Sequence, residues 1–234
     1  MDTTVDDTLE AGFLMRPIAR MRCPFGEKFG VPRQSGLVEE LRGEIRFEPP
    51  YRNRDALRGL EGFSHLWLVW VFHQAARRDW SPTVRPPRLG GNVRMGVFAT
   101  RSPFRPNPIG LSAVKLDAID YDAPLGPLLR VRGADLMDGT PILDIKPYLP
   151  YADRIPEASE GFAPEPEAAL DVEIPENLLD RIPPIHRDAL RGVLAQDPRP
   201  RYQSDPARVY GFRFGDREIR FRVEGETLIV TEVE

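Results

Sequence analysis

Short hydrophobic or alternating runs, separated by clusters of glycine and proline, occupy the chain from residue 13 to residue 148. Runs of this length with turn residues between them are typical of the strands of a β-barrel or a β-sandwich. Residues 66–72 are apolar at every position, which predicts a central strand buried on both faces. The pattern therefore predicts a mainly β body, with strands at residues 13–21, 41–47, 65–72, 96–100, 110–119, 128–136 and 141–148.

The residues after 150 follow a different pattern. Residues 153–176 are rich in proline and acids, which is typical of a linker or an extended crossing segment. Residues 186–196 have helical periodicity, and three alternating runs then predict a meander with a two-residue turn at Gly215 and Asp216. We expect a barrel domain over residues 1–150, a linker over 151–180 and a small α+β domain over 181–234, whose strands are residues 209–214, 217–223 and 227–233.

Charge is unevenly distributed along the chain. The net charge is -4, yet residues 77–105 hold seven arginines against one acid, and residues 181–222 hold ten arginines against five acids. Local basic patches of this kind attract phosphate groups. In residues 217–223 arginines alternate with apolar residues, which predicts one core face and one basic face. The candidate RNA-contacting residues are Arg88, Arg105, Arg199, Arg201, Arg220 and Arg222.

Two alternatives to RNA binding stay open for these arginines. Only three lysines accompany the 29 arginines, and an arginine-biased genome accounts for that ratio as well as selection for RNA binding does. The tail arginines could also pair with residues 153–180, where nine acids face one arginine. In that case the basic patch would be neutralised within one chain.

Composition argues against several kinds of site. Cys23 is the only cysteine and there are three histidines, so the sequence has no zinc-ligand spacing and we expect no metal. No apolar run approaches the roughly 20 residues that span a bilayer, and the chain opens with an acidic stretch. We therefore expect a cytoplasmic protein without membrane contact. A hydrolase is disfavoured because no nucleophile elbow is present.

The densest unusual segment is residues 85–112, in which prolines, glycines and arginines crowd together. Prolines restrict the backbone conformation, glycines allow a ligand or another segment to approach the backbone closely, and arginines supply positively charged guanidinium groups. This combination favours a functional loop over an awkward structural connection. At the same time, no strand is followed by Gly-x-Gly-x-x-Gly and a helix, so no Rossmann cofactor site is visible.

Six motifs in the sequence resemble those of the TrmO (YaeB-like) family. They include Lys-Phe-Gly-Val-Pro-Arg-Gln at residues 28–34 and Phe-Ser-His-Leu-Trp at residues 63–67. The resemblance implies a single-sheeted antiparallel β-barrel that binds S-adenosylmethionine, in most cases as a homodimer. It also implies methylation of N6-threonylcarbamoyladenosine in tRNA, the modified base next to the anticodon. The other matching stretches are residues 72–74, 98–112, 138–148 and 194–200.

The same resemblance implies which residues hold the cofactor. An arginine suits the methionyl carboxylate, a glutamine suits amide or ribose groups, and an aspartate suits the sulfonium or the amine. Without the resemblance, Asp138 and Gly139 would be interpreted as a hairpin turn and His73 as a strand-end histidine. The implied cofactor-binding residues are Pro32, Arg33, Gln34, His73, Gln74, Arg101, Leu111, Asp138, Gly139, Thr140 and Pro141.

Three residues are candidates for the chemical step, in which a weakly nucleophilic carbamoylated nitrogen must lose a proton. Asn107 with Pro108 is similar to the Asn-Pro pair with which unrelated adenine-N6 methyltransferases hold the amino group, although Asn-Pro is also a routine turn. Lys146 and Tyr148 alternate with Asp144 on one predicted strand face, which could equally be a solvated face. We expect an S-adenosylmethionine-dependent tRNA methyltransferase; the alternative is a non-catalytic RNA-binding module that retains the barrel.

Overall fold

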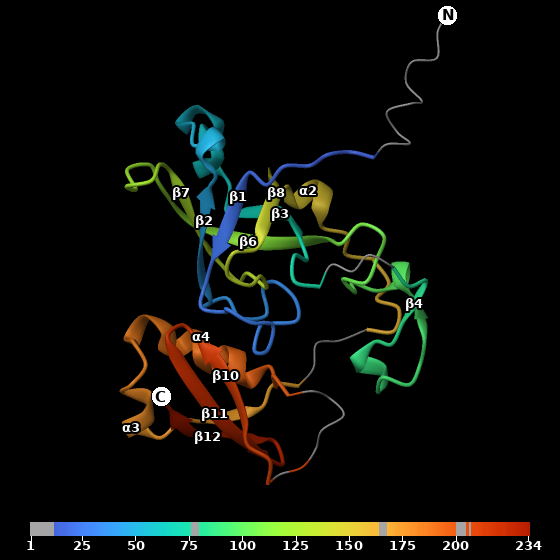
Figure 1. Cartoon of the computed structure of the whole chain (residues 1–234), viewed down its shortest axis with the longest axis vertical. Helices are drawn as coiled ribbons and strands as arrows, with labels where there is room; N and C mark the ends of the chain where they lie inside the picture. Colours follow the sequence, from blue (N-terminus) through green and yellow to red (C-terminus); the bar gives the residue numbers. More distant parts are fainter. Residues whose placement is uncertain (1–11, 76–79, 164–167, 200–204, 206) are drawn as a thin grey trace, which may run out of the picture.

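A closed antiparallel β-barrel forms the first part of the protein (Figure 1). The computed structural model describes residues 12–75, 80–163, 168–199, 205 and 207–234. Six strands close in the order β1-β2-β7-β6-β3-β8, and every neighbouring pair is antiparallel. This confirms the predicted single-sheeted barrel. Its strands are β1 (Ala19–Arg22), β2 (Arg42–Phe47), β3 (His65–Val71), β6 (Ile109–Asp120), β7 (Leu128–Arg132) and β8 (Pro141–Pro147).

The barrel core explains one wrong prediction. In β3, Leu66, Leu68 and Trp70 are buried inside the barrel, whereas Trp67 and the other alternate residues are half-buried or exposed. The apolar run is therefore not buried on both faces, because a sheet closed on itself has a single inner face. Facing side chains from the other strands complete the core, among them Met21, Ile45, Val114, Leu129, Val131 and Ile142.

Two predicted strands differ from the structure. β1 begins only at Ala19, and the side chains of residues 13–15 are exposed. Pro17 lacks the N–H that would extend the ladder toward the N-terminus. The strand predicted at residues 96–100 is not formed as such. Gly96 ends the two-residue strand β5 (Met95–Gly96), which pairs with β4 (Thr83–Val84), and the 3-10 turn η5 (Val97–Ala99) follows. Further 3-10 turns are η1 (Pro49–Tyr51), η2 (Arg54–Leu57), η3 (Leu60–Gly62) and η4 (Pro87–Leu89).

The C-terminal unit is a four-stranded sheet covered by helix α4 (Pro184–Ala195), as predicted for its α+β character. Part of the expected linker belongs to this unit. Val172 in β9 and Leu178 in α3 pack against its core, so the acidic side chains between them point outward and do not prevent folding. Helix α2 (Pro150–Asp153) follows β8 and lies beside the barrel (Figure 1). The elements of the C-terminal unit besides α4 are β9 (Asp171–Glu173), α3 (Glu176–Leu179), β10 (Tyr210–Phe214), β11 (Arg217–Glu224) and β12 (Thr227–Val233), with β9 parallel to β12.

The long connection between β1 and β2 joins the two units. Phe25, Val38 and Leu41 from this connection are buried in the C-terminal core rather than in the barrel core. Gly30 has φ +89° and lies against the ring of Phe212, where an added Cβ would come within 2.5 Å of the ring. Only glycine fits such a close approach with positive φ. The segment carrying residues 32–34 is therefore held between the barrel and the C-terminal unit.

Candidate functional site

One end of the barrel gathers several of the expected site residues. His73 and Gln74 follow directly after β3, and both are exposed. The N–H of Phe72 donates to the carbonyl of Pro108 at 2.9 Å, which places His73 beside Asn107. The side chain of Asn107 is exposed as well. The sequence thus brings two expected cofactor residues and one candidate for the chemical step to the same barrel end.

Leu111 lies on the outer face near that end. It pairs with Val69 across the β3–β6 ladder, and 56% of its side chain is exposed. Gly110, the residue before it, lies under the ring of Trp70, where an added Cβ would come within 2.3 Å of the ring. An exposed leucine at the start of a strand supplies an apolar contact surface for a ligand at the barrel end.

Gln34 and Arg101 are in direct contact, although they are far apart in the sequence. Nη1 of Arg101 donates a hydrogen bond to Oε1 of Gln34. The arginine comes from the segment after η5 and the glutamine from the connection between β1 and β2. The neighbouring Pro32 is buried, and Nη2 of Arg33 donates to the carbonyl of Asp197 at 3.3 Å. Burial lowers the pKa of Arg33, and the nearby charge of Arg88 acts in the same direction while Asp197 opposes them.

A buried polar chain lies behind this pair. Nε1 of Trp70 donates to Oγ of Ser112 at 2.9 Å, and that hydroxyl donates to Oδ1 of Asp135 at 2.5 Å. Burial raises the pKa of Asp135, whereas the hydrogen bond from Ser112 and the charge of Arg101 lower it. The carboxyl group also accepts from the backbone of Ser35, next to Gln34. Asp135 therefore bonds to the segment that carries Gln34, and its charge interacts with that of Arg101.

No sequence pattern had singled out Asp135. The usable signal was indirect: Trp70 lies in an apolar strand, and a buried indole N–H needs an acceptor. Ser112 is the one fully buried polar side chain on the neighbouring strand β6. Its hydroxyl accepts from the indole and needs an acceptor of its own, but the position of that acceptor is a property of the tertiary structure.

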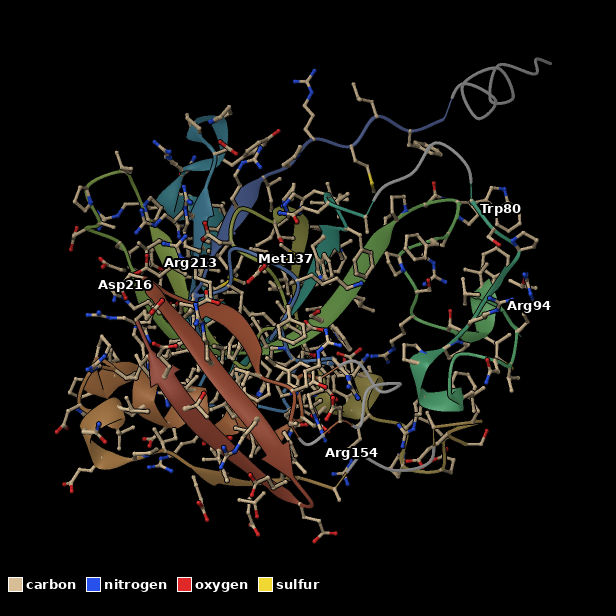
Figure 2. All side chains as sticks on the ribbon, turned by 60° about the horizontal axis from the view of Figure 1, so that its bottom comes forward. Trp80, Arg94, Met137, Arg154, Arg213 and Asp216 are labelled. Carbon is tan, nitrogen blue, oxygen red and sulfur yellow. The ribbon has the colours of Figure 1, made fainter. Side chains whose placement is uncertain are left out.

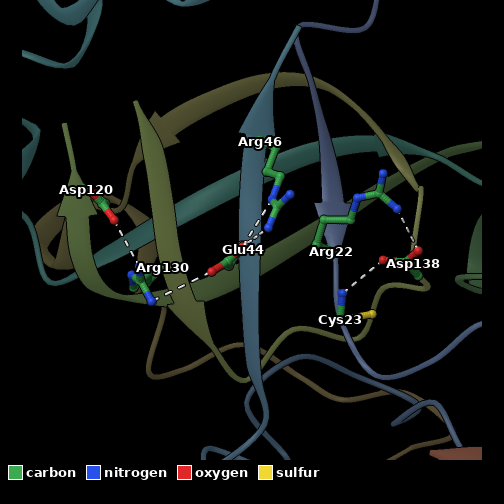
Figure 3. Close-up of polar contacts among 7 residues, drawn as sticks. All are labelled: Arg22, Cys23, Glu44, Arg46, Asp120, Arg130 and Asp138. Atoms are coloured by element: carbon green, nitrogen blue, oxygen red, sulfur yellow. Dashed lines mark hydrogen bonds and ion pairs between the residues drawn. The ribbon is translucent and has the colours of Figure 1, made fainter. Parts of the chain in front are cut away.

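The turn before β8 is tied to β1 (Figure 3). The carboxylate of Asp138 accepts from Nη1 of Arg22 at 3.0 Å and from the N–H of Cys23 at 3.1 Å. Gly139 has φ +74° and donates its N–H to the carbonyl of Met21 at 2.8 Å. Thr140 is buried, and the half-buried Pro141 opens β8. Within the protein, the residues 138–141 thus act as a structural turn, and their expected contact with a cofactor stays a prediction.

Cys23 has a structural role in the same turn. Its Sγ donates to the carbonyl of Leu136 at 3.1 Å. Burial raises the pKa of its thiol to about 12, which keeps the sulfur protonated and unreactive at neutral pH.

Lys146 and Tyr148 lie at the opposite end of β3 from His73. Lys146 is in register with Trp67, and the N–H of Tyr148 donates to the carbonyl of His65 at 3.0 Å. At about 3.3 Å per residue, the eight residues from His65 to His73 span about 26 Å. Nζ of Lys146 pairs with Asp144 at 2.9 Å, and the Tyr148 ring packs on Trp67 at a centroid distance of 5.5 Å. One protein chain therefore does not bring these two candidates to Asn107.

The C-terminal arginines are paired with acids of their own unit. Arg220 contacts Glu232 at 3.1 Å and Glu234 at 3.6 Å, and Arg222 contacts Glu224 at 2.8 Å. Among the described residues, their partners thus lie in the C-terminal sheet and at the C-terminus, and not in the acidic stretch of residues 153–180. The apolar face of β11 is buried as predicted.

Two further arginines of the expected RNA surface differ in their surroundings. Arg199 holds Asp197 with Nε at 2.8 Å, and only 14% of its side chain is exposed, which argues against an RNA contact. Nη1 of Arg105 donates to the carbonyl of Thr100 at 3.4 Å. Arg201 lies outside the described residues.

The residues gathered at the barrel end fit a ligand with a carboxylate, polar ribose groups and an apolar part. Arg101 supplies the guanidinium, Gln34 and Gln74 supply amide groups, and Leu111 supplies an exposed apolar surface. Such a mixture of one charge, a few polar groups and an apolar wall is what small-molecule sites require.

Two other classes of site are not seen in the described residues. There, no three histidine, cysteine, aspartate or glutamate side chains gather in a way that could hold a metal ion. None of the helices in the described ranges has the length and apolar character to cross a membrane.

A closed antiparallel barrel with a polar cluster at one end defines a class of small-ligand-binding β-barrel proteins distinct from Rossmann enzymes. Residues 20–154 match the family model of the tRNA-methyltransferase O N-terminal domain, and residues 167–234 match that of the TrmO C-terminal domain. The chain belongs to the TrmO family.

Several relatives are similar over nearly their whole length. A tRNA (adenine(37)-N6)-methyltransferase of Escherichia coli is 47% identical over 223 residues, which covers 91% of this chain and 94% of the relative. A putative S-adenosylmethionine-dependent methyltransferase of Pseudomonas aeruginosa is 42% identical over 221 residues, with the same coverage of 91% and 94%. The crystal structure of TrmO from Pseudomonas aeruginosa superposes with a TM-score of 0.79 at 36% identity and covers 95% of this chain and 98% of that chain.

Proposed function

We propose that this protein is an S-adenosylmethionine-dependent methyltransferase that methylates N6 of adenosine 37 in tRNA. The relative from Escherichia coli that shares 47% of its residues with this chain carries that activity in its name, and both family models match. The structural observation that carries the proposal is the Gln34–Arg101 contact at the barrel end, backed by Asp135. A purely RNA-binding module would have no need for this cluster.

The residues of the cluster have separate tasks. When bound, S-adenosylmethionine would supply a methyl carbon for in-line attack by N6, with the thioether S-adenosylhomocysteine as the leaving group and the N6 proton lost to solvent. Arg101 pairs with the methionyl carboxylate and is held in place by Gln34 and by the negative charge of Asp135. Leu111 packs against the apolar part of the ligand. Positioning of this kind can lower the barrier by about 7–11 kcal/mol.

Asn107 is the residue best placed to orient the nucleobase. Its amide oxygen is exposed at the same barrel end as His73 and can accept a hydrogen bond from the N6–H of adenine. An amide cannot take up the proton, so Asn107 aligns the nitrogen and does not act as a base. Lys146 and Tyr148 are too distant within one chain to share this task.

The finer substrate assignment is that the adenosine already carries a threonylcarbamoyl group. One of the arginines near the barrel end would bind the carboxylate of that group. If this contact orients the adenosine, its loss lowers the methylation rate more than it lowers RNA binding. We further propose that the protein acts in the cytoplasm and as a homodimer. Light scattering after size-exclusion chromatography at several protein concentrations tests the dimer, and a constant monomer mass would exclude it.

Nucleoside mass spectrometry tests the function. Purified protein, S-adenosylmethionine and tRNA from cells lacking the gene are expected to give a methylated threonylcarbamoyladenosine, and transcripts without the threonylcarbamoyl group should react far more slowly. Equal rates on both RNAs would refute the assignment of threonylcarbamoyladenosine as the substrate, whereas the methyltransferase activity itself would stand. No methylated adenosine in either RNA would refute the function.

A further inference from the structure

Two aromatic side chains of the β4–β5 region are exposed and stacked on one another. Trp80 precedes β4, and Phe98 lies in η5 after β5. Their ring centroids are 6.3 Å apart with planes inclined by 25°, and 49% of Trp80 and 73% of Phe98 is exposed. A tryptophan and a phenylalanine so exposed leave wide flat faces in water, which is unfavourable unless something covers them.

The same segment is rich in arginine and has no acid of its own. Residues 80–116 contain no aspartate or glutamate. Arg85 and Arg94 are exposed, and Nη1 of Arg94 contacts only a neutral group, the hydroxyl of Thr83 at 3.0 Å. In the described ranges neither arginine pairs with a carboxylate. Figure 2 shows Trp80 and Arg94 at the outer edge of the molecule, away from the C-terminal strands.

The segment is also continuous with the candidate site. Phe98 is three residues before Arg101, which contacts Gln34, and the chain then runs on to Asn107. The two rings and the residues at the barrel end are therefore joined by one short stretch of chain.

We propose that Trp80 and Phe98 form a stacking platform for an unpaired base of the tRNA anticodon loop, and that Arg85 and Arg94 hold the adjoining phosphates. This inference rests on the proposed function, since it takes the substrate to be tRNA. Stacked aromatic side chains flanked by arginines without acids match the chemistry of single-stranded nucleic acid, which offers flat bases on a charged backbone. A second copy of the chain that set the same platform against this one would bring like charges together, which is unfavourable.

The test uses the full-length protein and an anticodon stem-loop RNA that carries 2-aminopurine at an unpaired position beside the target adenosine. The double variant Trp80→Ala/Phe98→Ala is expected to bind this RNA about 5- to 150-fold more weakly, the range for losing a base–aromatic stack. It should also lose the quenching of 2-aminopurine that stacking produces. The conservative variants Trp80→Phe and Phe98→Tyr should retain both, because they keep a flat ring.

A matched control is Tyr151→Ala, which removes an aromatic ring of α2 that is 87% exposed, more than either platform ring. Its RNA affinity should equal that of the wild type. Calorimetric titration with S-adenosylmethionine should give the same affinity for the double variant and the wild type, which separates the platform from the cofactor site.

Unchanged RNA affinity and unchanged quenching in the double variant would overturn the platform. A wild-type dimer that dissociates in the double variant while RNA affinity stays the same would show that the rings bind a second copy instead. The two proposals fail separately: a wild-type protein that stacks the RNA but methylates no adenosine refutes the function and leaves the platform intact.

Discussion

The protein has two arginine-rich regions, and their surroundings differ. On the C-terminal sheet, Arg220 and Arg222 face glutamates of β11, β12 and the C-terminus, and the pairs neutralise one another. In residues 80–105, Arg85 and Arg94 have no carboxylate partner among the described residues and belong to the same β4–β5 region as the exposed rings of Trp80 and Phe98. Counting charges along the sequence made both regions look alike. Only unpaired cations attract phosphate strongly, so the β4–β5 region is the better candidate for RNA binding.

The largest expected effect concerns Arg101, where the β4–β5 region meets the cofactor residues. Arg101→Ala should weaken S-adenosylmethionine binding by about 1.5–3 kcal/mol, since a charge-assisted contact to a carboxylate is lost. Isothermal calorimetry measures this. The control is Arg130→Ala, whose guanidinium pairs with Asp120 at 2.9 Å on the barrel surface (Figure 3). If Arg101→Ala and Arg130→Ala bind S-adenosylmethionine with equal affinity, Arg101 does not hold the cofactor.

The next effect compares the two regions directly. Arg85→Glu/Arg94→Glu should weaken tRNA binding by at least about tenfold and reduce the slope of log affinity against log salt by up to about two units, because two phosphate contacts are lost. Arg220→Glu/Arg222→Glu should change both quantities much less. Filter binding at several salt concentrations distinguishes them. A larger loss of tRNA affinity in Arg220→Glu/Arg222→Glu would mean that the ion pairs of the C-terminal sheet open on RNA binding. The C-terminal sheet would then be the main RNA-binding region.

Asp135 provides a pH-dependent prediction. Burial raises its pKa above the ordinary aspartate value. The folded protein thus holds this proton more tightly than the unfolded chain, so the free energy of unfolding should fall as pH rises from the ordinary value through the raised one. Asp135→Asn should lack that fall, which urea denaturation across this pH range measures. Parallel pH profiles for the variant and the wild type would contradict the assignment.

The smallest effect is expected from releasing tail arginines. Glu232→Gln/Glu234→Gln removes the partners of Arg220 and leaves its charge free. Exposed ion pairs contribute about 0–1 kcal/mol, so stability should hardly change, whereas tRNA affinity at low salt should rise by a factor of about two to five. A decrease in tRNA affinity would mean that these glutamates themselves take part in RNA binding.

The sequence predicted the fold better than it predicted the site. Alternation and turn residues were sufficient for the barrel strands and for the meander with its turn at Gly215, because these depend on local spacing. The same signals missed β9 and α3 at residues 171–179. The acidic composition there predicted a linker, but the few apolar residues of this strand and helix pack in the core. The opposite error occurred at residues 96–100, where a strand was predicted from an apolar run that forms a 3-10 turn.

At the site, residue types were visible but partners were not. The motif residues Gln34 and Arg101 were both expected near a cofactor, and their contact could not be derived from spacing across 67 residues of chain. The ion pairs of Arg220 and Arg199 likewise depend on which acids the fold brings near. Asp135 had no distinguishing pattern at all, since its importance comes from burial beside Ser112.

The connection between β1 and β2 couples two events that are usually measured separately. Its residues Phe25, Val38 and Leu41 are part of the C-terminal core, while Gln34 in the same connection contacts Arg101 at the barrel end. A ligand that binds only when Gln34 is in place therefore also favours the state in which this core is intact. By mass action, saturating cofactor at 100 times its dissociation constant would add about 2.7 kcal/mol to the free energy of unfolding. We therefore expect bound cofactor to stabilise the C-terminal unit through this connection.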